Sequence, residues 1–427
     1  MRMGSVIVVA AACTTALILS ACSSGDGTGA TPDTTVVSTV AVPPSTAAPD
    51  DGVLRIGVLA PLTGDGATLG LSLQATVELA VAQINETGGV NGRPVQLQVA
   101  DEGADIATAT SGVDELARAD VDAIIGPTSS TVTLSLLDTI RRDHILSCSP
   151  TATAMSLDDF PDDGLFFRTA PSDSLQAEAI ARAIDQTGRS SVGLLYVDDA
   201  YGRPFADRVR QALANRSITV TANVPFLATD SSVDTQAKVA NVLGAPVIAV
   251  IGAADSGSRV VAAILEATPE LDTPIIVNDA MRGRPAADTF AQFPDAALER
   301  ITGIAPRALT DNEDFLSALA TVDPDASGLF AVNAFDCVNL IALAADAAES
   351  TDAQQIASRI PNVATSGTRC LTYADCAAGL VADRNIDYDG PSGLLQLAFD
   401  GDPNRGVYDV FHYTADGGEL PDGRINV

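Results

Sequence analysis

The sequence is short of the residues on which most catalytic and metal sites depend. Its 427 residues include no tryptophan, only two histidines and an aromatic content of 4%. Histidine is the most frequent general base in enzymes, and zinc sites use histidines or closely spaced cysteines. Because His144 and His412 lie far apart in the chain, we expect neither a histidine-dependent catalytic site nor a metal site.

Three common signatures are also missing from the sequence: the G-x-S-x-G nucleophile elbow, the H-E-x-x-H zinc motif and the G-x-x-x-x-G-K-S/T phosphate loop. Carboxylates are plentiful, but none is marked by its neighbours as half of a glycosidase pair. The sequence therefore predicts a protein that is not an enzyme and that needs no cofactor.

Positive charge is scarce as well. Lysine and arginine number 24 against 55 aspartates and glutamates, which gives a net charge of −31. Such a surface repels the phosphates of nucleic acids and of anionic lipids, so we expect neither as a partner. Hydrophobic residues make up 46% of the chain, which is enough for a core, and the length favours two domains.

The amino terminus is typical of an exported protein. Arg2 precedes an apolar run over residues 6–19, which is too short for a membrane-spanning helix. Small residues then lead to Cys22, and this arrangement resembles the lipobox of bacterial lipoproteins. The resemblance implies a signal peptide over residues 1–21 and lipidation of Cys22, which would anchor the protein to the outer face of the cell membrane. An ordinary cleaved signal with an incidental cysteine is the alternative.

Residues 22–52 are rich in Ser, Thr, Gly, Pro, Ala and Asp and have no periodicity. This composition predicts a disordered tether with a reach of about 30 Å. Beyond it lie four cysteines, and outside the cytoplasm these can pair. Cys370 and Cys376 are so close in sequence that we expect a local disulfide between them, while the pairing of Cys148 and Cys337 stays open.

Strand and helix patterns alternate through the rest of the chain. Apolar segments predict strands at residues 53–60, 95–99, 121–125, 145–148 and 165–168, and then at 192–197, 219–225, 247–251, 274–278 and 301–305. Helical periodicity separates them, for example over residues 69–84, 175–187 and 257–267. This alternation predicts an α/β protein with two doubly wound, mostly parallel sheets covered by helices on both faces.

The tail has a different pattern. Helices are predicted near residues 311–321 and over the apolar stretch 329–349. Two strands, 394–399 and 408–413, are predicted to be joined by the turn Asp400-Gly401-Asp402-Pro403.

Two hydroxyl-rich turns stand out as a candidate binding site. Residues 128–131 and 149–153 each follow a predicted strand, and the first turn opens a helix. Ligands of open α/β sheets bind at the carboxyl ends of strands, and a helix N-terminus attracts anions, so these turns suit a small carboxylate. The simpler interpretation is that Ser129 or Ser130 only caps the helix. Further polar turns at residues 198–201 and at Asn278-Asp279 would face the ligand from the second lobe.

Six segments together resemble a known family. They are IGVLAPLTGDGATLG at 56–70, INETGGVNGRPV at 84–95, IIGPTSSTVT at 124–133, ILSCSPTAT at 145–153, FFRTAPSD at 166–173 and VDDAYGRPF at 197–205. They are similar to the solute-binding proteins of branched-chain amino acid ABC transporters, the Leu/Ile/Val-binding type with the type I periplasmic binding fold. The resemblance implies three hinge crossovers between a first lobe at 53–169 and 304–390 and a second lobe at 170–303 and 391–427.

The resemblance also assigns ligand-binding roles. Ser130, with Ser129 beside it, corresponds to the serine that holds the ligand carboxylate. Thr151 and Thr153 correspond to the turn that meets both carboxylate and ammonium, Tyr201 to the tyrosine that closes over the solute, and Asp279 to the acidic partner of the ammonium. Where relatives carry an aromatic wall, this chain has Gly252-Ala253-Ala254-Asp255.

The expected function is that of a monomeric, membrane-tethered receptor that closes on an amino acid and delivers it to an ABC permease. Two alternatives remain at this point. The same fold could sense a solute and signal to a membrane partner, or it could bind a short amide, urea or an aromatic acid.

Overall fold

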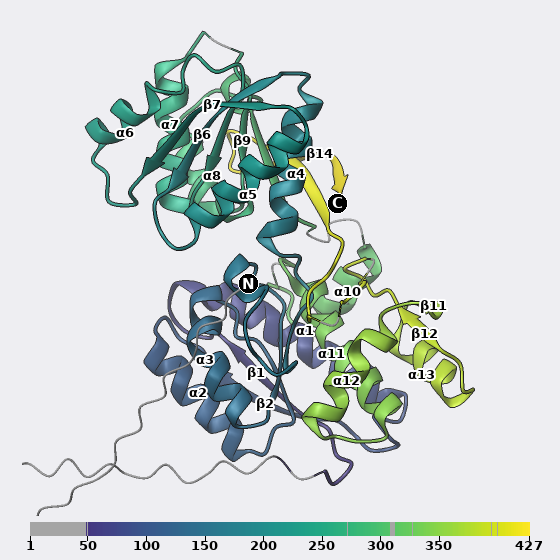
Figure 1. Ribbon diagram of the computed structural model, residues 1–427. Helices are drawn as coiled ribbons and strands as arrows, with labels where there is room; N and C mark the ends of the chain where they lie inside the picture. The colour runs from purple at the N-terminus through teal and green to yellow at the C-terminus, as the bar shows by residue number, and fades with distance from the viewer. Residues whose placement is uncertain are drawn as a thin grey trace, which may run out of the picture. The chain divides into compact units, whose positions relative to one another are not determined.

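The computed structural model describes residues 48, 50–270, 272–307, 312–326, 328–393, 395–398 and 400–427, with all side chains in these ranges except those of residues 65, 284 and 285. Figure 1 shows the ribbon. The predicted signal peptide, Cys22 and most of the predicted tether lie outside the described residues.

The first sheet consists of parallel strands from the first part of the chain. Its order is β2-β1-β3-β4-β5 within the described residues. The strands are β1 (Arg55–Ala60), β2 (Gln96–Asp101), β3 (Ala123–Ile125), β4 (Leu146–Ser149) and β5 (Phe166–Arg168). The order reverses between β1 and β3, and in doubly wound sheets such a switch point is where ligands bind.

Alternate side chains of these strands point to opposite faces, and each face is covered by helices (Figure 1). Leu59 and Ile124 pack against α2 (Ile106–Arg118) and α3 (Ser130–Arg142). Ile56, Val58 and Ile125 pack on the other side, with α1 (Ala67–Glu86), α11 (Ala331–Ala348) and α12 (Ala353–Val363). Segments far apart in sequence therefore share one core.

Two of these helices, α1 and α11, are long and apolar enough to cross a membrane. The fold uses them as core helices instead, because 56% and 83% of their most apolar windows are buried within it. The continuous apolar pattern of α11 reflects this burial on most of its sides.

The second sheet repeats the strand order of the first and adds two strands. Its order is β14-β13-β10-β9-β8-β6-β7 in the described part of the chain. The strands are β6 (Ser191–Val197), β7 (Thr219–Phe226), β8 (Ile248–Ile251), β9 (Ile275–Val277), β10 (Ile301–Pro306), β13 (Val407–Tyr413) and β14 (Glu419–Asn426). Strands β6 to β10 are parallel, whereas β13 runs antiparallel to both β10 and β14.

Helices cover both faces of this sheet too. One face holds α4 (Asp173–Gln186) and α5 (Gly202–Asn215). The other holds α6 (Ser232–Val239), α7 (Ala254–Ala267), α8 (Arg284–Phe290) and α9 (Asp295–Leu298). The predicted fold class, two α/β lobes with mostly parallel sheets, is confirmed.

Shorter elements complete the description. They are η1 (Gly64–Gly66), η2 (Met155–Leu157), η3 (Asp279–Met281), α10 (Glu313–Val322), β11 (Thr368–Cys370), α13 (Tyr373–Val381) and β12 (Ile386–Tyr388). A disulfide joins Cys370 to Cys376, as the short spacing predicts. A second disulfide, left open by the sequence, joins Cys148 of β4 to Cys337 of α11.

The chain passes between the two sheets three times: after β5, after β10 and before β13. Before the last passage it still packs on the first lobe, because Ser392 N donates to Asp336 Oδ2 and Leu395 and Leu397 belong to the core around α11. Arg168 N also donates to Gly401 O. We therefore propose that the first lobe extends to about residue 406 rather than ending at 390.

The predicted hairpin of strands 394–399 and 408–413 is wrong. Strand β13 pairs instead with β14, which the sequence did not reveal. Among the described residues of the 394–399 segment, only an isolated bridge from Leu397 to Pro403 is present. Strand β14 was missed because its sequence, ELPDGRIN, is polar and contains Pro421 and Gly423, features tolerated at a sheet edge.

Candidate functional site

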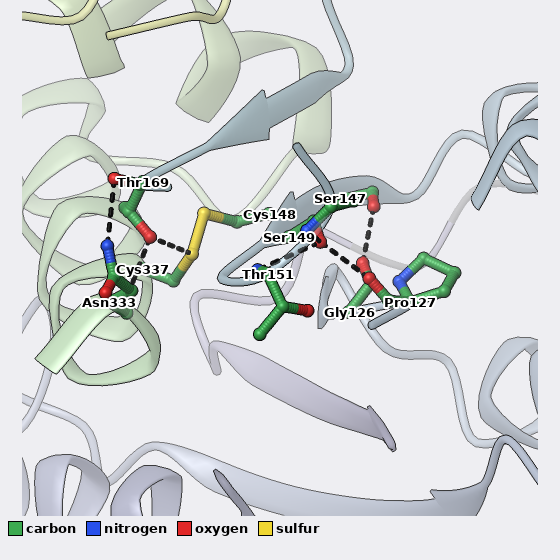
Figure 2. Close-up of a disulfide and its surroundings, with 10 residues drawn as sticks. Gly126, Pro127, Ser147, Cys148, Ser149, Thr151, Thr169, Asn333 and Cys337 are labelled. Atoms are coloured by element: carbon green, nitrogen blue, oxygen red, sulfur yellow. Dashed lines mark hydrogen bonds between the residues drawn. A yellow bond between two sulfur atoms is a disulfide. The ribbon is translucent and has the colours of Figure 1, made fainter. Parts of the chain in front are cut away.

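Hydrogen bonds join the turn after β3 to the end of β4 and to the turn that follows it (Figure 2). Ser147 Oγ donates to Gly126 O at 2.7 Å, and Ser149 Oγ donates to Pro127 O at 2.6 Å. Beyond these, Thr151 Oγ1 donates to Thr128 O at 2.7 Å. Because the two strands are neighbours in the sheet, the two predicted turns lie side by side.

The path of the first turn depends on a glycine. Gly126 has a φ of 121°, and a Cβ atom there would lie 2.1 Å from Leu59 O. Only glycine fits such a position without moving β1. The following Gly126–Pro127 peptide bond is cis, and the chain then enters the hydroxyl-rich segment that starts α3.

Ser129 and Ser130 are free of the capping role that the simpler interpretation gave them. Ser129 occupies the N-cap position of α3, but its side chain makes no capping hydrogen bond. Ser130 Oγ accepts a hydrogen bond from Ala154 N of the second turn at 3.2 Å, so its own hydroxyl proton can still be donated. The first N–H groups of a helix have no partner within the helix, and this end of α3 also carries the positive end of its dipole.

The two predicted threonines, Thr151 and Thr153, differ in the hydrogen bonds that they make. The hydroxyl proton of Thr151 is already used in the bond to Thr128. Thr153 is 91% buried, and its carbonyl oxygen accepts a hydrogen bond from Asp173 N at 2.9 Å. Thr153 therefore connects the second turn to the start of α4.

A buried carboxylate at Glu102, which the sequence did not single out, fixes the start of α3. It accepts hydrogen bonds from Thr128 N at 2.8 Å, from Thr128 Oγ1 at 2.7 Å and from Ser129 N at 3.0 Å. Burial raises the pKa of Glu102. Its position directly after β2, beside the switch point, is the only sequence signal that could have marked it.

A buried guanidinium supports the second turn from behind. Arg168 is fully buried and pairs with Asp402 at 2.6 Å and with Asp158. It also donates to Ala152 O at 3.3 Å and to Ala154 O at 3.1 Å, on either side of Thr153. A buried charge needs such complete pairing, so Arg168 ties the turn firmly to β5.

Three loops of the second sheet meet around Asn278. Its Nδ2 donates to the hydroxyl oxygen of Tyr201 at 2.8 Å, and its Oδ1 accepts from Gly252 N at 3.0 Å. The half-buried ring of Tyr201 packs edge-on against Phe205, with ring centroids 5.8 Å apart. Asp279 follows directly, as the first residue of η3. The structure thus brings the two predicted residues, Tyr201 after β6 and Asp279 after β9, to the carboxyl ends of strands that flank β8.

Asp173 is where residues of the two sheets converge. It is 1% exposed and is the first residue of α4. Its pKa is raised well above the usual range by burial and then by the negative charge of Asp279, and the pKa of Tyr201 is raised by burial and then by the charge of Asp173. In the sequence, Asp173 is the last residue of the FFRTAPSD segment, and no role was predicted for it.

Three oxygens of this region lack hydrogen-bond partners among the described residues: Asp173 Oδ1, Gln176 Oε1 and Asp279 Oδ1. Buried polar atoms are nearly always paired, so three unpaired acceptors in one region are unusual. They form an electron-rich end of the site, whereas the N-terminus of α3 forms a donor-rich end.

Residues 53–393 match the family model described as periplasmic binding protein. The chain belongs to this family. Among curated relatives, the chemotactic signal transduction system substrate-binding protein BasB of Halobacterium salinarum is 28% identical over 81% of this chain and 83% of its own length. The Leu/Ile/Val-binding protein BraC3 of Rhizobium johnstonii is 30% identical over 40% of this chain and 46% of its own length.

The fold matches solved structures across nearly the whole described chain. The branched-chain amino acid transporter substrate binding protein LivJ of Streptococcus pneumoniae, solved in complex with isoleucine, has a TM-score of 0.66 at 22% identity. The match covers 88% of this chain and 99% of that one. It supports the same two-lobed architecture.

Within this family fold, the wall expected to face the solute side chain is lined by small residues. A Cβ atom on Gly252 would lie 2.8 Å from Gly257 Cα and 3.0 Å from Phe226 Cζ. Ala253 is exposed at the N-cap of α7. The close packing of α7 against the end of β8 therefore excludes a side chain at position 252, and the sequence places no aromatic residue at 253–255.

Proposed function

We propose that this chain is the extracytoplasmic receptor of an ABC importer and that it binds an amino acid of the branched-chain type, or a related small polar solute, between its two lobes. The observation that carries the proposal is the pairing of a donor-rich end at Ser130 with three unpaired acceptors around Asp173. A zwitterion needs this combination of groups. Family membership supports the proposal, as do the Leu/Ile/Val-binding relatives.

The carboxylate of the solute would bind at the N-terminus of α3. Ser130 offers a hydroxyl proton, and Ser129 lies beside it at the N-cap. Thr153 completes this wall, while Thr151 contributes mainly by holding the two turns together. Fixed donors cost little reorganisation when an anion arrives, so the wall is prepared before the solute enters.

The ammonium group would bind at Asp279 and Asp173. Each carboxyl group has one buried oxygen without a partner in the described chain, and the two lie close enough for the charge of Asp279 to raise the pKa of Asp173. A cation between them would relieve this repulsion. Tyr201, whose hydroxyl is held by Asn278, would close the site from the second lobe.

The first prediction concerns Asp279. The purified protein should bind at least one member of an amino acid panel in calorimetry, and Asp279→Asn should weaken binding about 10-fold to 150-fold, the equivalent of about 1.5–3 kcal/mol for a charge-assisted hydrogen bond. A simple amide without an ammonium group should lose little affinity. Asp207→Asn, which removes an exposed carboxylate paired with Arg210 on α5, is the matched control and should bind normally.

Two results would count against this assignment. Absence of binding across amino acids, short amides and urea would reject the solute class. Equal losses for an amino acid and an amide in Asp279→Asn would reject contact between Asp279 and the ammonium.

The second prediction concerns pH. Burial raises the pKa values of Asp173 and Asp279, so these carboxyl groups are largely protonated at a pH below their raised pKa values. A bound ammonium favours their ionised form instead. Solute binding should therefore release protons, and affinity should rise as the pH is raised above the ordinary carboxyl range of about pH 4, because fewer of these groups then have to lose a proton on binding. Calorimetry in two buffers of different ionisation enthalpy measures the released protons. The double variant Asp173→Asn/Asp279→Asn should lose the dependence, and an affinity that falls with rising pH would contradict it.

Solute sensing is a second candidate, because the BasB relative belongs to a chemotactic signal transduction system and aligns over most of both chains. Deleting the gene in its own organism separates the two functions. Loss of uptake of the radiolabelled solute supports transport, whereas unchanged uptake with a lost behavioural or transcriptional response supports sensing.

We also propose that the protein is a monomer tethered to the outer face of the membrane through lipidated Cys22, and that it presents the closed form to the permease. The sequence before Cys22 supports the tether. The expected outcome for Cys22→Ala is release from the membrane fraction into the soluble fraction, with solute affinity unchanged. A variant that stays with the membrane would show that another segment anchors the chain.

A further inference from the structure

We propose that the Cys148–Cys337 disulfide is a positioning element for the solute site, which holds the second hydroxyl-rich turn in place against a hinge crossover. The inference rests on the proposed function, because it concerns how the same site is kept ready for its solute. Figure 2 shows the bridge between the turn and α11.

On one side, the bridge ends directly before the turn. Cys148 is followed by Ser149, whose Oγ donates to Pro127 O at 2.6 Å and accepts from Ala152 N at 3.0 Å. Backbone bonds also join this strand end to the first turn, since Gly126 N donates to Cys148 O at 2.9 Å. A displacement of Cys148 would therefore move both turns.

On the other side, the bridge ends beside a hinge. The Sγ of Cys337 lies 3.5 Å from Thr169 Oγ1, and that hydroxyl donates to Asn333 O at 2.9 Å. Asn333 Nδ2 returns a bond to Thr169 O at 3.0 Å. Thr169 is the first residue after β5, where the chain leaves the first sheet for α4 and Asp173.

The turn and the hinge are thus connected twice. Thr169 N donates to Ser149 O at 3.3 Å, and Asp173 N donates to Thr153 O at 2.9 Å. The atoms involved are well shielded, because both bridged cysteines are at most 1% exposed and Thr169 is 3% exposed. The bridge fixes this corner to α11, the central core helix, so that the donor wall and the Asp173 acceptor keep their separation.

A purely stabilising role is the competing explanation. A bridge between residues 189 positions apart restricts the unfolded chain strongly wherever it lies in the fold. Such a role lowers the melting temperature when the bridge is removed but leaves the affinity of the folded protein unchanged. A positioning role changes the affinity itself.

The test compares two double variants of the full chain with the wild type. Cys148→Ala/Cys337→Ala removes the proposed positioning element, and Cys370→Ala/Cys376→Ala removes the other bridge, which ties β11 to α13 away from the turns. Solute affinity is measured by calorimetry at a temperature where circular dichroism finds all three proteins folded. We expect at least a tenfold increase in Kd for the first variant and less than a twofold change for the second.

Wild-type affinity in the folded Cys148→Ala/Cys337→Ala protein would overturn the inference, even if its melting temperature were lower. A wild type that binds no solute overturns the proposed function and this inference with it. If the double variant does not fold, Cys148→Val/Cys337→Ala, which also lacks the bridge but fills part of the space of the two sulfurs, is measured in its place against the same control. The same tenfold increase in Kd is expected, and wild-type affinity in that folded protein would reject the inference.

Discussion

The hydrogen bonds that join the turns after β3 and β4 are the interaction on which the rest of the site depends. Each turn alone is a short polar loop, but hydroxyl groups of Ser147, Ser149 and Thr151 connect them to one another. Glu102 and Arg168 then fix the pair to the first sheet from two sides. Ordering a flexible loop is a large entropic cost of binding. Because these donors are already fixed, they would bind the carboxylate of the proposed solute without that cost.

The opposite end of the site works by a different physical means. Burying an ionised carboxylate without a cation costs free energy, and burial accordingly raises the pKa values of Asp173 and Asp279. A solute that carries a positive charge removes this penalty, whereas a neutral solute does not. If the proposed site is correct, selectivity for charged amines over amides would follow from leaving these acceptors unpaired, without an additional contact.

Much of this arrangement was accessible from the sequence because it is local. Alternating strand and helix patterns predicted the two lobes, and the hydroxyl clusters at strand ends predicted a site at the two turns. The roles of Ser130, Thr151 and Thr153 came from the family resemblance and stay predictions. The short loop between Cys370 and Cys376 predicted their disulfide. Glu102, Arg168 and Asp173 escaped prediction because single buried charges have no periodicity, and their importance appears only through partners such as Asp402, more than 200 positions away.

The sequence by itself determined the fold class, the two polar turns and the family, since these depend on residue patterns within a few turns of helix or lengths of strand. Only the tertiary structure decided that Cys148 pairs with Cys337 and that β13 pairs with β14. It alone brought Asp173 close enough to Asp279 for the charge of one to raise the pKa of the other. These features join segments distant in the chain, and which segments meet is settled by the packing of the whole core.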